Sequence, residues 1–313
     1  MVTVRSHLVH VEFDFDTEVI DEVQAAALAE AYENALTEIA AHCRDRLELG
    51  LTVRTPSDFS ASELTADEVE RIVGQLAQSG QILDIDGIED IHDLSPLQEA
   101  ILLEAQQNPC SGAYVLQQVV DAHMPAGDID VCHVRDALRA VMARHSALRT
   151  AIVSAGLHRP RQVVLAERTC HVEEAHPSEA PGALDALLES EADRGFDLAT
   201  DPLVRVTVLP RETGATMLWT FHHIVIDAWC MGTIFEDFAT AYENLAAGQP
   251  PAEVLNAARR AAPDLASVLT HLQQRDDDGV EDYWCELLSG YEGSSGILPV
   301  EPADGLRDRK SVV

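Results

Sequence analysis

Basic residues are scarce in this chain. Its 313 residues contain 21 Lys and Arg against 54 Asp and Glu, which gives a formal net charge of −33. Nucleic acids and anionic membranes are themselves negatively charged, so we expect neither as a partner of so acidic a protein. The acidic residues are spread along the chain rather than gathered in a tail, and this indicates a solvated surface.

Several functional motifs are also absent. The six cysteines form no C-x-x-C pair and no zinc-like spacing, so we expect no bound metal, and scattered thiols favour a reducing cytoplasm over a disulfide framework. No signal peptide opens the chain, and no apolar run is long enough to span a membrane. Phosphate-binding glycine loops and the G-x-S-x-G nucleophile elbow are missing too. These absences predict a cytoplasmic protein.

The N-terminal part of the chain predicts a strand, a long helix and a linker. Residues 2–15 alternate between apolar and polar side chains, as a strand does. Asp16 or Thr17 can cap the helix that follows. A short amphipathic helix within residues 59–90 then belongs, in our interpretation, to a linker that tethers two parts. From Leu94 onward Ser95 is a predicted N-cap, so another helix begins there.

A paired histidine follows the apolar run from Met217 to Phe221, which has the length of a buried strand. His222 and His223 occupy adjacent positions, so at most one of them faces a shared cavity. Asp227 precedes apolar residues at helical spacing and lies near a helix N-terminus. A histidine backed by a carboxylate suits acid/base chemistry. On these residues alone, two structural histidines in a chain with 13 remain the simpler interpretation.

The surrounding sequence favours the functional interpretation. The string H-H-I-V-I-D-A at residues 222–228 resembles the H-H-x-x-x-D-G signature of condensation domains of nonribosomal peptide synthetases, in the chloramphenicol acetyltransferase-like superfamily. Four further stretches resemble motifs of that family, in family order: L-S-P-L-Q-E at 94–99, R-H-S-A-L-R-T at 144–150, F-D-L…P-L-V-R at 196–205 and Y-W-C-E-L-L at 283–288. Five motifs in order identify the chain as a member of the family.

The resemblance implies an α/β fold, a chloramphenicol acetyltransferase-like lobe with a mixed sheet flanked by helices. Condensation domains have two lobes of similar size, and we expect the second to be largely missing. Residues 1–58 resemble the C-terminal tail of an upstream epimerization or condensation domain, and 59–90 are the linker. Residues 91–307 are then the N-terminal lobe and the start of the second, and 308–313 a non-native tail.

Residue roles follow from the resemblance. His223 occupies the catalytic position and His222 supports its packing. The family pairs the aspartate of the motif with an arginine, so Asp227 is expected to pair with Arg149, or else with Arg144. Ala228 stands where the family has glycine, and its Cβ matters if that position requires a positive φ.

The expected reaction is amide-bond formation between aminoacyl or peptidyl thioesters on carrier proteins, with a D-configured donor. The protein is expected to bind no cofactor directly, because its substrates arrive on the 4′-phosphopantetheine arms of upstream and downstream peptidyl carrier domains. An adenylation domain of the same module is a further expected partner. An epimerization domain and a non-catalytic docking or scaffold fragment remain alternatives.

Overall fold

The computed structural model divides the chain into two compact units, residues 1–269 and 270–313. It describes residues 2–5, 8–12, 14–17, 19–48, 54–108, 112–122, 129–175, 182–211, 214–263, 265–273 and 279–291. Helix α8 (Leu265–Gln273) spans the boundary between the units, and the second unit contains α9 (Val280–Leu287). The expected tail at 308–313 lies outside the described residues.

A four-stranded sheet carries the histidine motif. Its order is β4 (Val115–Ala122), β9 (Ala215–His222), β8 (Val204–Pro210) and β7 (His171–Glu174). The pair β7 and β8 is parallel and the other two pairs are antiparallel. The sheet is therefore mixed, as predicted.

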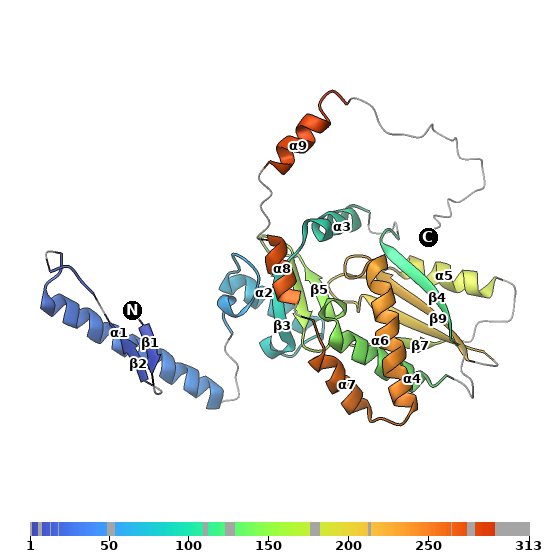
Figure 1. Ribbon diagram of the computed structural model, residues 1–313, viewed down its shortest axis with the longest axis horizontal. Coiled ribbons are helices and arrows are strands. Elements are labelled where there is room, and N and C mark those ends of the chain that lie inside the picture. The colour runs from blue at the N-terminus through green and yellow to red at the C-terminus, as the bar shows by residue number, and fades with distance from the viewer. Residues whose placement is uncertain are drawn as a thin grey trace. The chain divides into compact units, whose positions relative to one another are not determined.

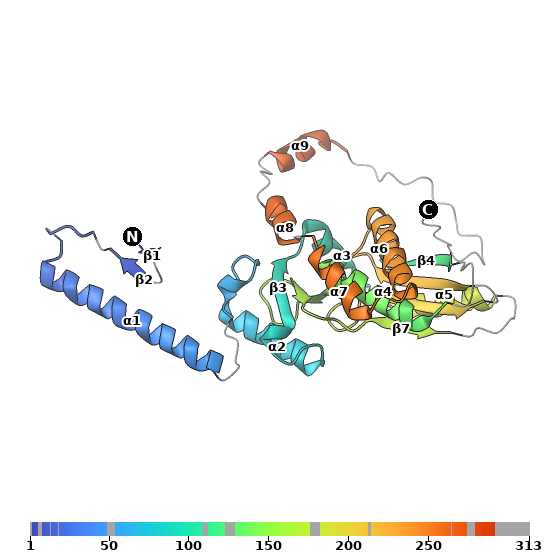
Figure 2. The same cartoon turned by 60° about the horizontal axis from the view of Figure 1, so that its bottom comes forward.

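Helices cover both faces of this sheet (Figure 1). On one face lie α4 (Val131–Arg144), α6 (Ala228–Ala246) and α7 (Pro251–Arg260), and Figure 2 shows the three side by side. Their apolar side chains share one core with β7, β8 and β9. On the other face lies α5 (Ala183–Arg194). The predicted α/β lobe with a mixed sheet flanked by helices is confirmed.

The alternation along β9 assigns each side chain to one of these faces. Met217, Trp219 and Phe221 pack into the core shared with α4 and α6. His222 has the opposite parity and therefore belongs to the α5 side. On that side Arg205 of β8 pairs with Glu191 of α5, with 3.1 Å between Nε and Oε2.

A second, three-stranded sheet is antiparallel, in the order β3 (Ile88–Asp93), β6 (Arg161–Leu165) and β5 (Thr150–Val153). Helix α2 (Ala66–Gln78) buries Ile72 and Leu76 against it. This helix lies in the predicted linker, yet its apolar face belongs to a core. The sequence suggested that this helix only tethers two parts of the chain. It instead packs into a core, because an amphipathic helix is stabilised when its apolar side chains are buried.

Further elements complete the described chain. Helix α3 (Pro96–Gln107) begins at the predicted N-cap Ser95, and the short 3-10 helices are Pro56–Asp58, Ile85–Gly87 and Ser146–Arg149. At the N-terminus the predicted single strand is two strands, β1 (Val2–Arg5) and β2 (Leu8–Val11), which pair antiparallel.

The long N-terminal helix also begins later than predicted. Helix α1 (Glu22–Glu48) is preceded by Asp21, not by Asp16 or Thr17. The Asp21 carboxylate accepts the Gln24 N–H at 2.8 Å, and the Gln24 side chain accepts the Asp21 N–H at 3.1 Å. This reciprocal pair is a capping box, which satisfies two backbone donors at once.

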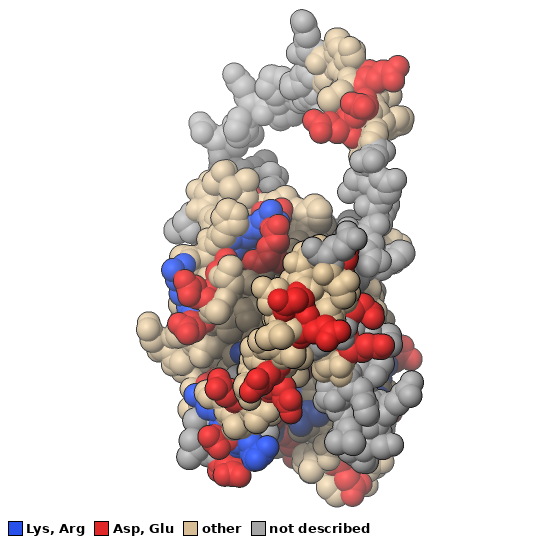
Figure 3. All heavy atoms as spheres, turned by 90° about the vertical axis from the view of Figure 1, so that its left-hand side faces the viewer, with Lys and Arg blue, Asp and Glu red and all other residues tan. Residues whose placement is uncertain are grey.

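The surface reflects the composition. Acidic side chains are more widespread than basic ones on the face in Figure 3. Within the described part of the chain, no helix combines the length and the apolar character needed to cross a membrane.

Candidate active site

Strand β9 ends at His222, and His223 is the first residue of the turn that follows. Only 3 % of His222 is exposed, whereas His223 is half-buried. The turn runs through Ile224 and Ile226, both buried, to the start of α6. The two histidines thus occupy different environments, as the predicted division of roles requires.

The His223 ring is oriented by its own turn. Its Nδ1 lies 2.9 Å from the carbonyl oxygen of Ile226, and its backbone N–H donates to the carbonyl of Tyr114 at 2.8 Å. A carbonyl can only accept a hydrogen bond, so Nδ1 must carry the proton. In the neutral ring Nε2 then holds the lone pair. This tautomer is the one a proton acceptor needs, with the basic nitrogen on the side away from the turn.

His222 is held in the complementary tautomer. Its Nδ1 accepts the backbone N–H of Ile224 at 3.2 Å and so must be unprotonated. Burial, followed by the proximity of His223, lowers the pKa of His222 to about 4. The rings of Tyr114 and Phe196 lie 6.4 and 6.1 Å from it between centroids. His222 is therefore a neutral packing residue at physiological pH.

Asp227 caps helix α6. Its carboxylate accepts the N–H of Cys230 at 2.9 Å, and the residue is exposed. Hydrogen bonds from the side chain and backbone of Cys230 lower the pKa of Asp227. Partial burial and the neighbouring Asp227 raise the pKa of the Cys230 thiol, which favours its protonated form.

The predicted pair of Arg149 and Asp227 is wrong. Arg149 is buried and donates to the carbonyls of Met142 (2.9 Å from Nε) and Leu165, and it pairs with Glu89 at 2.8 Å. The guanidinium thus satisfies main-chain acceptors at the end of α4 and in β6. Asp227 needs no such partner, because the first turn of its own helix supplies the donor.

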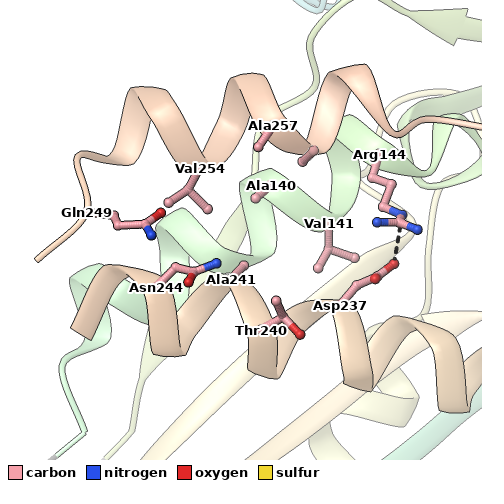
Figure 4. Close-up of a pocket in the computed structure, with 11 residues that line it drawn as sticks. Ala140, Val141, Arg144, Asp237, Thr240, Ala241, Asn244, Gln249, Val254 and Ala257 are labelled. Atoms are coloured by element: carbon pink, nitrogen blue, oxygen red, sulfur yellow. Dashed lines mark ion pairs between the residues drawn. The ribbon is translucent and has the colours of Figure 1, made fainter. Parts of the chain in front are cut away.

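Arg144, the alternative partner, does not meet Asp227 either. Its Nε lies 3.1 Å from the carboxylate of Asp237, which His145 also contacts at 2.6 Å. Figure 4 shows Arg144 and Asp237 reaching toward each other between α4 and α6. They line a cavity of about 160 Å³ that includes Thr240. Asp237, the lining residue on α6 that comes first along the chain, is ten positions after Asp227. This corresponds to a rise of about 15 Å along the helix, so the cavity is not the histidine site.

Ala228 is the first residue of α6. Among the described residues other than glycine, Glu63 and Tyr114 have a positive φ, and Ala228 does not. The methyl group of alanine therefore causes no backbone strain at the position where the motif has glycine.

Three residues of the site were not predicted. Tyr114 has φ +64°, supplies the carbonyl that holds His223, and lies edge-on to its ring at 6.3 Å. Gln98 donates from Nε2 to the carbonyl of Ile224 at 3.1 Å, and Ile226 orients His223. The Ser95-x-x-Gln98 spacing is a capping-box signature and could have identified Gln98 as the third residue of its helix. No sequence pattern predicts the roles of Tyr114 and Ile226.

Within the described ranges, no three His, Cys, Asp or Glu side chains are grouped to hold a metal ion. The chemistry that these residues themselves offer is proton transfer or hydrogen bonding at Nε2 of His223. A half-buried imidazole whose Nδ1 donates to a carbonyl can accept a proton from a nucleophile at Nε2.

Comparison with protein families matches residues 88–311 to the condensation domain. A linear gramicidin synthase subunit of Brevibacillus parabrevis is 28 % identical over 97 % of this chain and 6 % of its own length. Bacitracin synthase 3 of Bacillus licheniformis is 25 % identical over 92 % of this chain and 4 % of its own length. A plipastatin synthase subunit of Bacillus subtilis (strain 168) is 32 % identical over 67 % of this chain and 8 % of its own length. The chain thus spans less than a tenth of each of these relatives.

Solved structures share the fold. The starter condensation domain of rhizomide synthetase RzmA has a TM-score of 0.50 at 20 % identity, over 65 % of this chain and 49 % of that one. A complex of the X-domain and OxyB from teicoplanin biosynthesis matches with a TM-score of 0.53 at 25 % identity, over 67 % of this chain and 46 % of that one. The chain spans about half of each.

Proposed function

The chain belongs to the condensation domains of nonribosomal peptide synthetases, and on that premise we propose that it takes part in amide-bond formation between thioesters on carrier proteins. The observation that carries the proposal is the hydrogen bond from Nδ1 of His223 to Ile226, which leaves Nε2 as the basic nitrogen. The half-buried setting of His223 supports it, because a substrate must reach that nitrogen.

The proposed step is acyl transfer. The nitrogen of the acceptor amine attacks the carbonyl carbon of the donor thioester, and Nε2 of His223 takes a proton from that nitrogen. The C–S bond then breaks, and the departing sulfur receives the proton, so the products are an amide and a thiol. A positioned histidine of this kind contributes about 10²–10⁴-fold to a rate.

The finer assignments belong to the same proposal. The donor has the D configuration, and both substrates are carried on 4′-phosphopantetheine arms of upstream and downstream peptidyl carrier domains. An adenylation domain of the module supplies the acceptor. Residues 1–58 are the tail of an upstream epimerization or condensation domain, residues 91–307 are the N-terminal lobe and the start of the second lobe, and the remainder of a second lobe completes the site. The scattered free cysteines support a cytoplasmic setting.

A docking module is the second candidate. It is favoured by the similarity to a structure of the X-domain in complex with OxyB, because a related fold there takes part in a protein complex. The two candidates differ in their dependence on His223. A docking module retains its function when the basic nitrogen is removed, and an amide-forming enzyme does not.

The experiment loads a donor and an acceptor carrier protein with defined aminoacyl groups and follows the dipeptidyl thioester by mass spectrometry. The protein tested carries a second lobe after these residues. Donors of D and L configuration are compared in parallel. Dipeptide formation supports the proposal, and a preference for the D donor supports the finer assignment. A folded, extended protein that binds both carriers and forms no amide would contradict the proposal and favour the docking module.

A further inference from the structure

We infer that Gln98 is a positioning residue for His223, an inference that rests on the proposed function. Gln98 lies on α3, 125 residues before His223, and contacts the turn rather than the ring. It acts through the carbonyl of Ile224, to which its Nε2 donates at 3.1 Å.

The orientation of the Gln98 amide is determined by its neighbours. Its Oε1 accepts the backbone N–H of Ser95 at 2.9 Å, while Ser95 Oγ accepts the N–H of Gln98 at 3.3 Å. This capping box turns the NH₂ group toward the histidine turn. There Nε2 meets two acceptors, the carbonyl of Ile224 and Oε1 of Gln162 at 3.2 Å. An amide nitrogen has two hydrogens, so both contacts can exist together.

Gln162 connects this contact to the three-stranded sheet. It lies on β6 with 3 % exposure, and its own Nε2 donates to the carbonyl of Asp93 at 2.9 Å. The turn itself is attached to the four-stranded sheet, where His223 donates to Tyr114. Gln98 therefore links the histidine turn to the other sheet, at a place where Ile224 is buried against Leu94 and other apolar residues.

The hydrogen bond from Gln98 to Ile224 restrains the turn that holds the Ile226 carbonyl, and this carbonyl selects the tautomer of His223. Ile224 is two residues before Ile226, whose carbonyl accepts from Nδ1 of His223. With the carbonyl of Ile224 released, the turn can relax, and the Ile226 carbonyl no longer has a fixed place opposite Nδ1. The Nδ1–H tautomer then loses its preference, and a smaller fraction of the rings presents a basic Nε2. Misplacement of about 1 Å costs up to roughly 10²-fold in rate.

Two substitutions separate this role from helix capping. Gln98→Glu keeps an oxygen for the Ser95 N–H, as the capping box allows, but cannot donate to Ile224. Gln98→Met removes both functions without adding charge. The matched controls are Gln106→Glu and Gln106→Met on the same helix, where Gln106 is exposed and contacts Ser154 at 3.3 Å. Thermal unfolding establishes that each variant is folded.

The first measurement is the tautomer of His223, from ¹⁵N shifts of the 313-residue chain labelled at histidine and assigned with His223→Asn. We expect the Nδ1–H form in the unaltered chain and in the Gln106 variants, and a mixture of both tautomers in the Gln98 variants. The second is amide formation by the protein extended with its second lobe, where we expect kcat to fall about tenfold or more with KM little changed.

The two measurements fail independently. A folded Gln98 variant with the unaltered His223 tautomer and an unaltered rate overturns the inference. A changed tautomer in a protein that forms no amide even when unaltered contradicts the proposed function and leaves the positioning role supported. If both Gln98→Glu and Gln98→Met prevent folding while the Gln106 variants fold, Gln98 is a stability residue and the inference is also overturned.

Discussion

The imidazole Nδ1 of His223 and the carbonyl oxygen of Ile226 are 2.9 Å apart, and this contact determines which nitrogen of the ring is basic. The neighbouring His222 uses its Nδ1 in the opposite sense, as an acceptor from Ile224. Two chemically identical side chains at consecutive positions are thus held in different tautomers. The difference arises from the turn, because one nitrogen meets a carbonyl and the other an N–H.

His223→Ala in the extended protein should reduce amide formation by about 10²–10⁴-fold, because the basic nitrogen is lost. His222→Asn should reduce it far less, since the Asn side-chain oxygen can still accept the Ile224 N–H. Dipeptidyl thioester formed per minute from loaded carriers is the measurement. Equal losses in the two variants would contradict the separate roles.

The stability of the chain should depend on pH through His222. Its pKa is lowered to about 4 in the folded protein from the ordinary 6.5, so the unfolded chain binds a proton first as the pH falls. The contribution of His222 is therefore complete above pH 6.5. This contribution is lost as the pH falls from 6.5 to about 4, and below about 4 the free energy of unfolding no longer changes with pH through His222. At about 1.4 kcal/mol for each pKa unit the loss is roughly 3 kcal/mol.

Urea unfolding between pH 4 and 7.5 measures this effect. Carboxylates also titrate in part of this range, so the comparison is with His222→Asn, which lacks the titrating group. We expect the free energy of unfolding of the variant to depend less on pH, by the amount attributed to His222. Parallel pH profiles of the two proteins would show that His222 is protonated equally in the folded and unfolded chains.

Arg149→Leu should lower the free energy of unfolding by about 2–4 kcal/mol, because it leaves the carbonyls of Met142 and Leu165 buried without a donor. Asp227→Asn should change it by less than about 0.5 kcal/mol, since Asn and Asp cap helices almost equally well. Chemical denaturation of the 313-residue chain measures both. A comparable, non-additive loss from the two substitutions would restore the pair that the structure excludes.

Tyr114→Gly should give a more stable protein than Tyr114→Ala, by about 1 kcal/mol. Both variants lose the ring that lies against the two histidines, but the backbone at this position has φ +64°, which glycine adopts without strain. The difference in midpoint of thermal unfolding between the two variants isolates the backbone term. If alanine is as stable as glycine, the left-handed conformation of Tyr114 is not retained in the variants.

Local features of this protein follow from short stretches of its sequence. The cap at Ser95 was predicted, as were the helix start beside Asp227, a strand over Met217 to Phe221 that leads to the paired histidine, and the family to which the histidine motif belongs. Each depends on residues within a few positions of one another, where hydrogen-bond partners are set by helix and strand geometry. The later start of α1 shows the limit, because Asp16, Thr17 and Asp21 are all competent caps and the local signal alone did not separate them.

Partners that are distant along the chain depend on how the helices and sheets pack. Arg149 pairs with Glu89 rather than Asp227, Arg144 pairs with Asp237, and Gln98 reaches Ile224. A buried guanidinium or amide binds whichever acceptors the packed elements leave unsatisfied near it, and those are identified only once sheets and helices are in place. The tautomer of His223 belongs to the same class, because it depends on where one turn brings one carbonyl oxygen.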